Sequence, residues 1–486
     1  MPPFPDHHTP HVPVPRDAGP DLAPDVAPDA THGNANAAGT AGAASGSAPA
    51  AASGMPEMPD LPDAAGTSAP SRAAGGKPGP LRVFRHRNYR LFFAGQSISL
   101  PGTWMQSMAQ SWLVYRLSES SFILGALGFA AQLPLFVLSV FGGALADSHD
   151  RRTILVCTQA ASMLLALTAA VLTMTDLVQV WHVFVLATTL GIVNAFDVPT
   201  RQSFIMDMVG REDLPTAIGL NSSMFNAARV VGPTLAGLMV AAAGEGWCFL
   251  LNAVSFVPVI AGLLMMRLPV YTPPPPGPST LQRIREGFGF AARHEGIRTL
   301  LLLVGATSLI GVNYSVLMPV VADKVLGGNA RTLGLLLGAA GAGALLGALC
   351  LALRRSSQGL SRWALYAAMG LGASLTAFAL CRSVWAALLA LVPVGMCMVV
   401  LMASANTLLQ IMSPDAYRGR VMALYSMMFL GMGPFGSLLG GTVAHALGPS
   451  PTLLLSGVVC LGNALWFGLW LRRHGVDMES MTAANN

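Results

Sequence analysis

Charged side chains are scarce in this chain. Asp, Glu, Lys and Arg together make up 10% of its 486 residues, whereas soluble domains contain roughly 25%. Hydrophobic residues, by contrast, reach 53%. This composition excludes an ordinary soluble domain and predicts an all-α polytopic membrane protein surrounded by the lipid bilayer.

Motifs for metal, cofactor and catalytic chemistry are also missing. The six cysteines are scattered in or beside apolar segments without C-x-x-C spacing, so we expect free thiols, no metal site and no disulfide framework. The sequence contains no nucleophile elbow, phosphate-binding loop or metal-binding helix pattern. These absences argue against an enzyme, and we expect no cofactor.

A concentrated basic region is absent as well. The formal net charge is +5, but the basic residues are spread over many short loops, unlike the basic stripe of nucleic-acid-binding proteins. We therefore expect no nucleic-acid partner. Residues 1–80 contain almost no large apolar side chains and lack the apolar segment of a signal peptide, which predicts a disordered tail that is not a cleaved signal peptide.

Long apolar runs follow one another from Tyr89 onward. Each run is long enough to cross a hydrocarbon layer of about 30 Å. The sequence predicts twelve transmembrane helices, over residues 89–115, 121–146, 153–174, 178–198, 216–243, 247–267, 299–322, 332–353, 363–381, 384–410, 421–445 and 451–471.

The distribution of Lys and Arg predicts the orientation of these helices. Cytoplasmic loops of membrane proteins carry an excess of basic residues. With the N-terminus in the cytoplasm, 22 basic residues flank the helices on the cytoplasmic side and four lie on the opposite side. We therefore expect both termini in the cytoplasm.

Two features recur in the second half of the chain and predict two pseudo-symmetric six-helix bundles. Gly232-Pro233 and Gly433-Pro434 are the Gly-Pro pairs inside apolar spans and lie 201 residues apart, and an arginine pair after helix 2 recurs after helix 8. The linker between the bundles contains PPPPGP and an amphipathic stretch that predicts a surface helix. The expected divisions are the tail over 1–80, bundles over 81–267 and 299–473, a cytoplasmic linker over 268–298 and a C-terminal tail over 474–486.

One charge lies deep inside an apolar span. Arg229 is about 20 Å from each end of the helix predicted over 216–243, and a guanidinium at that depth costs about 3 kcal/mol in lipid. It should therefore face protein, water or a ligand. Pro233 leaves the carbonyl of Arg229 without its helical donor, and the offset of 201 places Leu430 at the corresponding position. We interpret Arg229 as substrate-binding; the alternative is a structural arginine that helix carbonyls satisfy.

The first predicted helix carries a polar stripe and no acid. The stripe residues recur at steps of three or four and share one helical face. They are Gln96, Ser99, Thr103, Gln106 and Gln110. The stripe either faces a substrate path, which would make these residues substrate-binding, or forms hydrogen bonds to a neighbouring helix. Trp104 beside it could stack on a flat ligand, and Asn313 and Tyr314 form the corresponding polar patch of helix 7.

The loop GALADSHDRRTIL between helices 2 and 3 resembles the signature loop of the major facilitator superfamily. The matching residues are Gly143, Leu145, Asp147, Arg151 and Arg152, while Ser148 and Asp150 replace a usual arginine and glycine. In that family the aspartate caps helix 11 and the arginine pairs with an acid at the inner end of helix 4, where Asp197 stands here. The resemblance implies a gating role for Asp147, Arg151, Arg152 and Asp197. The alternative is that the loop supplies only positive-inside charges.

The stretch ARVVGPTLAG resembles the helix 5 motif of exporters in this superfamily. This resemblance implies a gating role for Gly232 and Pro233, and the repeat extends that role to Gly433 and Pro434. Further stretches, NYRLFFAGQSIS, GTWMQSMAQSWLVYRL, DVPTRQSF and GREDLPTAIGLNSSMFNAARVVGP, make residues 82–475 similar to the branch that contains the enterobactin exporter and the transmembrane secretion effectors.

The resemblance implies export of a small siderophore-like or drug-like molecule across the bacterial inner membrane by alternating access. It also implies exchange for protons. Asp197 is one candidate carrier because it is the acid nearest to the depth of Arg229; the alternatives are coupling through Arg229 and the substrate's own ionisation, or a different form of coupling. We expect a functional monomer. An importer of the same fold and a receptor or scaffold without transport activity are the alternatives.

Overall fold

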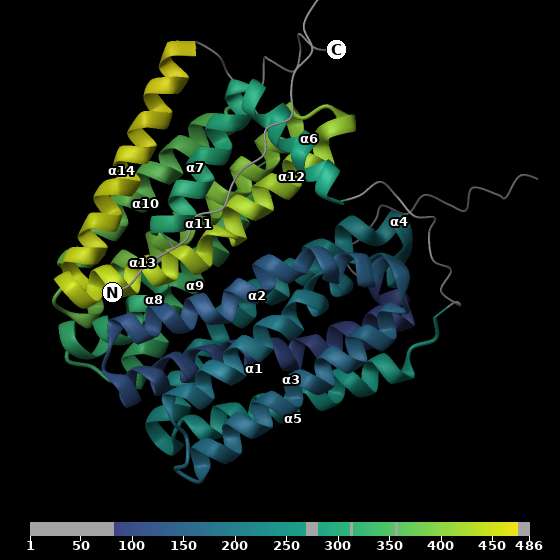
Figure 1. Cartoon of the computed structure of the whole chain (residues 1–486), viewed down its shortest axis with the longest axis vertical. Helices are drawn as coiled ribbons and strands as arrows, with labels where there is room; N and C mark the ends of the chain where they lie inside the picture. Colours follow the sequence, from purple (N-terminus) through teal and green to yellow (C-terminus); the bar gives the residue numbers. More distant parts are fainter. Residues whose placement is uncertain (1–81, 269–279, 312–313, 355–357, 475–486) are drawn as a thin grey trace, which may run out of the picture. The chain divides into compact units, whose positions relative to one another are not determined.

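A computed structural model describes residues 82–268, 280–311, 314–354 and 358–474. The described chain is almost entirely helical (Figure 1). The helices are η1 (Arg82–Arg85), α1 (Arg87–Ser118), α2 (Ser121–Ser148), α3 (Arg151–Met174), α4 (Val180–Ala243), α5 (Glu245–Met265), α6 (Thr280–Arg293), α7 (Glu295–Gly311), α8 (Tyr314–Val320), η2 (Val321–Val325), α9 (Ala330–Ala352), α10 (Leu360–Leu380), α11 (Val384–Met412), α12 (Asp415–Leu430), α13 (Met432–Leu447) and α14 (Pro449–His474). The predicted tail over 1–80, the PPPPGP stretch and Asn313 lie outside the described residues, as does all but the first residue of the C-terminal tail.

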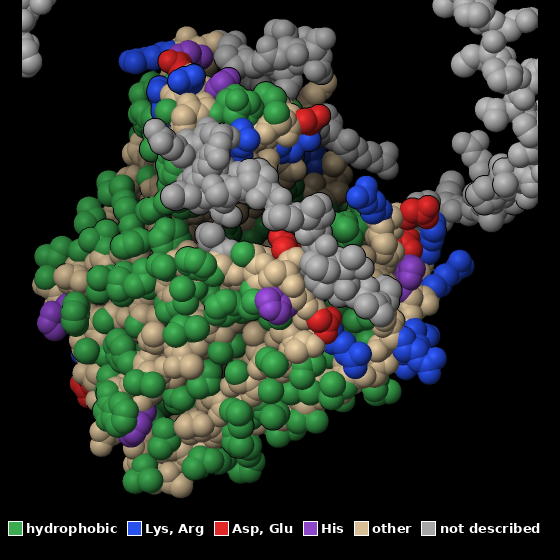
Figure 2. Space-filling view, turned by 45° about the vertical axis from the view of Figure 1, so that its right-hand side comes forward, with side chains coloured by type: hydrophobic (Ala, Val, Ile, Leu, Met, Phe, Trp, Pro, Cys, Tyr) green, Lys and Arg blue, Asp and Glu red, His purple; other side chains and the backbone are tan. Residues whose placement is uncertain are grey.

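Ten helical segments in the described ranges are long and apolar enough to cross a membrane. Their outward surface is apolar, and the side chains of Leu353, Trp385 and Leu389 are more than 70% exposed. Figure 2 shows hydrophobic side chains over much of one face, with most visible Lys and Arg near the top and right. An apolar surface of this extent is suited to lipid rather than to water.

The predicted loop between the fourth and fifth spans is wrong. Residues 199–215 are helical and belong to α4, which runs for 64 residues. The stretch has an apolar face, on which Phe204 and Met208 are buried against Tyr89. The φ of 71° and ψ of 178° at Gly210 are not helical, so α4 consists of two helices that meet at a kink there.

Two other predicted spans differ from the structure. The seventh, predicted over 299–322, consists of α7, α8 and the π-helix η2, and it begins four residues earlier, at Glu295. The eleventh, predicted over 421–445, divides at Gly431 into α12 and α13. The predicted surface helix of the linker is present as α6, which packs against α12.

Two helix crossings join α1–α5 to the second half of the chain: α4 packs on α9, and α2 packs on α13. A Cβ atom on Gly237 of α4 would lie 2.9 Å from the Cα atom of Gly334 on α9. A Cβ atom on Gly441 of α13 would lie 2.7 Å from the Cα atom of Gly125 on α2. Both crossings therefore bring backbones together at a pair of glycines, as small residues allow between membrane helices.

Hydrogen bonds and ion pairs hold further parts of the chain together. The Tyr115 hydroxyl at the end of α1 donates to Asp323 in η2 at 2.6 Å, which connects the two halves. The Asp213 carboxylate on α4 pairs with Arg82 at 3.4 Å and with His86 at 2.8 Å. The ion pairs of Asp213 connect the start of the described chain to the part of α4 that follows Gly210.

Candidate functional site

Two cavities meet beside α1. The first has a volume of about 350 Å³ and is lined by residues of α1–α5, including Gln96, Thr103 and Gln106. The second has a volume of about 400 Å³, and both halves of the chain line it, with Arg229 from α4 and Tyr314 from α8. Residues that line both cavities are Trp104, Ser107, Gln110 and Ala131.

The polar stripe of α1 makes hydrogen bonds to α5 at some positions and lines a cavity at others. The Gln106 side chain is buried and accepts a hydrogen bond from Asn252 of α5 at 2.7 Å. Ser99 accepts one from Ser255 of α5 at 3.4 Å. Thr103 and Gln110 remain accessible at the cavity walls. The stripe thus fastens α1 to α5 at some positions and presents polar groups to a cavity at others.

Asp197 is the buried acid of the first cavity. Its side chain is 2% exposed and pairs with Arg201 one helical turn later. It also accepts hydrogen bonds from Thr158 at 2.9 Å and Gln159 at 2.7 Å, both on α3. Gln96 of α1 lies 3.5 Å from Arg201. The carboxylate is therefore fully paired, as a buried charge requires.

Arg229 is held differently. Its guanidinium carbon lies 5.8 Å from the centre of the Trp104 ring, within the range of a cation–π contact. Among the described residues, no carboxylate pairs with it and no side chain is recorded as its hydrogen-bond partner. The Arg229 carbonyl faces Gly341 of α9, where an added Cβ atom would lie 2.9 Å from the oxygen. The guanidinium therefore offers its donors to the second cavity.

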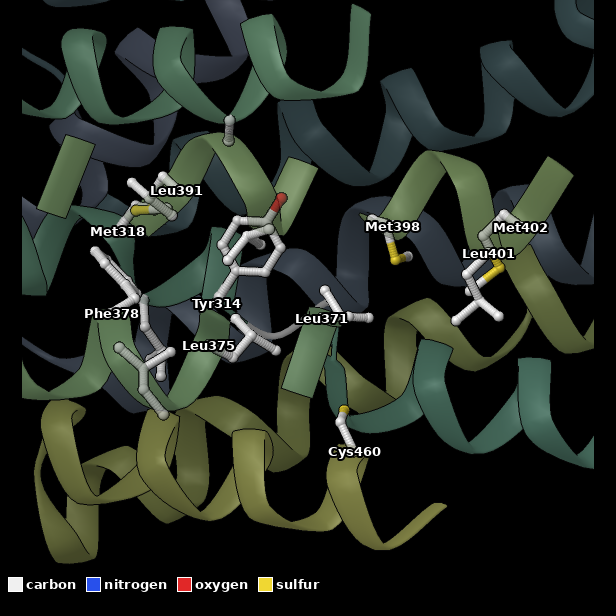
Figure 3. Close-up of a cluster of buried hydrophobic side chains, with 14 of the residues drawn as sticks. Tyr314, Met318, Leu371, Leu375, Phe378, Leu391, Met398, Leu401, Met402 and Cys460 are labelled. Carbon is white, nitrogen blue, oxygen red and sulfur yellow. The ribbon is translucent and has the colours of Figure 1, made fainter. Parts of the chain in front are cut away.

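Tyr314 reaches the same cavity from the second half of the chain. It is 4% exposed and belongs to the main hydrophobic cluster. Figure 3 shows it beside Leu371 and Leu375. The Tyr314 ring therefore packs in the hydrophobic cluster and also contributes to the wall of the second cavity.

The Gly-Pro residues lie at close helix contacts. A Cβ atom on Gly232 would lie 2.5 Å from the Cβ atom of Trp104, and one on Gly433 would lie 2.9 Å from the Gln132 side-chain oxygen. Pro233 lines the second cavity, and Pro434 is buried in α13. α4 continues as a helix through Pro233, whereas the second half is interrupted at Gly431, close to Pro434.

The signature loop makes a different ion pair from the expected one. Arg151 contacts both oxygens of Asp207 at 2.9 Å and lies 3.6 Å from Asp147, and Arg152 donates to the carbonyl of Leu264. The expectation that Asp197 is the acid partner is wrong, because α4 stays helical past Asp197 and brings Asp207 to the loop. Sequence reasoning missed Asp207 because it assigned that region to a loop.

Comparisons with known proteins agree with this architecture. Residues 78–485 match the family described as transmembrane secretion effector. The chain is 24% identical to the staphyloferrin A transporter of Staphylococcus aureus, over 78% of this chain and 95% of that protein. It is 28% identical to the multidrug efflux pump Tap of Mycolicibacterium fortuitum, over 74% and 91%, and 24% identical to the enterobactin exporter EntS of Shigella boydii, over 77% and 91%.

Solved structures show the same fold at lower identity. A POT family transporter matches with a TM-score of 0.65 at 12% identity, covering 80% of this chain and 96% of its own. A bacterial homolog of the human lysosomal transporter Spinster matches with a TM-score of 0.61 at 14% identity, covering 82% and 98%. The family match extends over most of the chain, and the chain belongs to the transmembrane secretion effector family of the major facilitator superfamily.

Proposed function

We propose that this protein exports a small organic molecule with an anionic group across the bacterial inner membrane by alternating access. The observation that carries the proposal is Arg229, a cation without a described acid partner, at the wall of a cavity that both halves line. A guanidinium recognises carboxylate and similar anions through paired hydrogen bonds. Relatives named as siderophore transporters and efflux pumps support the export of siderophore-like or drug-like compounds.

The proposed topology has twelve transmembrane helices in two six-helix bundles. Two additions to the ten apolar segments give this number. The first addition is α1, whose 32 residues are enough to span the membrane although its polar stripe lowers its hydropathy. The second comes from α4, whose 64 residues would extend about 96 Å as one helix, about three times the hydrocarbon thickness. We count α4 as two spans that meet near Gly210. Both termini then lie in the cytoplasm, and the monomer contains a complete site.

We further propose that export is coupled to proton entry through Asp197. Among the described residues, Asp197 is the acidic residue that lines the first cavity, and no acidic residue lines the second. Antiport requires that the proton and the substrate compete, so a hydrogen-bond donor or cationic group of the substrate would have to reach the Asp197–Arg201 pair. Gating residues in this proposal are Asp147, Arg151, Arg152, Gly232, Pro233, Gly433 and Pro434.

The test is accumulation in cells that lack or overproduce the protein. We would measure labelled catechol siderophore, a labelled macrolide and a cationic dye. Export predicts that overproduction lowers retention of the siderophore, and that Arg229→Leu removes this effect at an unchanged protein level. Higher retention would indicate import instead. Unchanged retention of every compound, with the protein present in the membrane, would contradict transport.

A further inference from the structure

The two cavities share four lining residues, and one of them is a tryptophan. Trp104 lines both cavities, together with Ser107, Gln110 and Ala131. The other three are small or flexible side chains. We infer that Trp104 divides one substrate site into two chambers and sets the size of the molecule that can occupy both. This inference rests on the proposed function.

The surroundings of Trp104 fix its backbone but leave its ring little polar restraint. Gly232 brings α4 so close to α1 that an added Cβ atom would lie 2.5 Å from the Trp104 Cβ atom and 2.7 Å from the Pro101 carbonyl oxygen. The indole meets the Phe225 ring edge to face, with 5.5 Å between ring centres. The guanidinium carbon of Arg229 lies 5.8 Å from the centre of the Trp104 ring. The structure describes no hydrogen bond from the indole nitrogen.

The two chambers offer different chemistry. The first presents amides such as Gln96 and Asn194, with the Asp197–Arg201 pair at its wall. The second presents Arg229 among largely apolar side chains and Tyr314. The matching substrate is an extended molecule with an anionic aromatic part for the second chamber and an amide- or hydroxyl-rich part for the first.

Volume separates small from large substrates. Each chamber lies near the lower end of the range of about 300–1,000 Å³ for ligand pockets. A small anion fits the second chamber alone, whereas a larger molecule needs both chambers and therefore needs the indole to move. Charge-assisted hydrogen bonds from Arg229 to an anion are stronger than its contact with the ring, so an anionic substrate weakens the restraint on Trp104 as it binds.

The experiment compares two probes that share one chemical group. Purified full-length protein in lipid nanodiscs is tested for binding of a labelled cyclic tri-catechol siderophore and of labelled dihydroxybenzoate, a single catechol carboxylate. Trp104→Ala should tighten binding of the large probe relative to the small one by roughly 10-fold, the scale of size discrimination in apolar pockets. Trp104→Phe should give a smaller change in the same direction and guards against a folding defect in the alanine variant.

Trp112→Ala is the matched control. This tryptophan lies two turns farther along α1 and lines neither cavity, so its removal should leave the affinity ratio unchanged. If Trp104→Ala changes the affinity for both probes equally, or if neither Trp104 variant changes the affinity ratio, the inference is wrong. Binding of the probes to the wild-type protein would still support the proposed function in that case. Absence of wild-type binding to both probes would instead count against the proposed function and the inference together.

Discussion

Arg229 and Asp197 are two charged residues of α4 that the protein satisfies in different ways. Asp197 has a fixed set of partners in Arg201, Thr158 and Gln159. The Arg229 guanidinium contacts the face of the Trp104 ring and otherwise lines the second cavity. A charge whose protein partners are complete suits a role in gating or proton exchange, whereas one with free donors suits binding of a ligand that comes and goes.

Arg229→Lys tests the shape of the cation as distinct from its charge. Lysine keeps the positive charge but loses the planar pair of donors. Loss of one charge-assisted hydrogen bond, at about 1.5–3 kcal/mol, predicts at least roughly 10-fold weaker binding of the catechol siderophore. Equilibrium binding to protein in nanodiscs measures this. Arg331→Lys, at an exposed position away from both cavities, is the control, and equal affinity in all three proteins would exclude an anion clamp.

Asp197→Asn tests proton coupling. The amide can still accept from Thr158 and Gln159 but cannot carry a proton, so uphill export driven by a pH gradient should fall at least roughly 10-fold while exchange of labelled for unlabelled siderophore persists. Reconstituted vesicles allow both measurements. Asp213→Asn also removes a buried, paired carboxylate, but one outside the cavities, and should retain gradient-driven export. Retained uphill export in Asp197→Asn would assign the proton to another group.

Sequence periodicity predicted the face of α1 but could not assign its tasks. Steps of three and four identify which residues share a face. Whether Gln106 binds Asn252 or a ligand depends on how closely α5 approaches, which is a long-range property. The prediction also missed Asp207 as the partner of Arg151, because it ended one span at residue 198 and began the next at 216, whereas the stretch between them has a buried apolar face and is helical except at Gly210.

The backbone conformation of Gly210, within α4, places a clear restriction on which residue can occupy that position. Its φ of 71° with ψ of 178° lies in a region that is essentially open only to glycine. Gly210→Ala should therefore lower stability by about 1–3 kcal/mol, although an added Cβ atom would meet nothing within 4 Å. Thermal denaturation followed by size-exclusion chromatography checks this.

Gly219→Ala is the matched control for that change. Gly219 also has nothing within 4 Å of an added Cβ atom, but it lies inside α4 with helical geometry. Alanine there should be neutral or stabilising by up to about 1 kcal/mol. Equal behaviour of the two variants would show that the conformation at Gly210 is not required.

The glycine crossings revise the internal repeat. Gly441 meets Gly125 as Gly237 meets Gly334, so the packing relates α4 to α13 at an offset of 204 residues, rather than the 201 that the Gly-Pro pairs indicated, and α2 to α9 at an offset of 209. Arg229 then corresponds to Gly433 and not to Leu430. The conclusion that the cation belongs to the first half is unchanged. Sequence comparison gave the wrong register because identical dipeptides need not occupy identical packing positions.

Gly237→Val should disrupt one crossing. Its side chain would meet the backbone of α9, with Ala330 oxygen 2.8 Å from the added Cβ atom, and backbone cannot move aside as a flexible side chain can. Overpacking of this kind costs about 1–3 kcal/mol, so melting temperature and siderophore export should both fall. Gly462→Val, where nothing lies within 4 Å, should leave both unchanged; a similar loss in that variant would point to a general effect of valine.

At the scale of the whole molecule, composition was sufficient to predict a polytopic helical protein but not its exact helix boundaries. Hydropathy identifies apolar stretches, yet α1 is too polar to pass that test although it is long enough to span. The proposed count of twelve can be checked with reporter fusions. A fusion after His149 should report a cytoplasmic position and one after Asp176 a position across the membrane. The same side for both would contradict the topology, since α3 lies between them.

The paired glycine crossings have a consequence for how the sequence can vary. Contacts made between backbones demand only that no side chain intrudes, so they constrain four positions strictly and leave their neighbours free. The residues of the cavity walls are not repeated between the two halves in this way, since the position equivalent to Arg229 is Gly433, which carries no charge. A saturation mutagenesis survey should therefore find intolerance at Gly125, Gly237, Gly334 and Gly441 alike, while tolerance around the cavities differs between the two halves. The repeat would then be preserved as a scaffold, while substrate range evolves on one side of it.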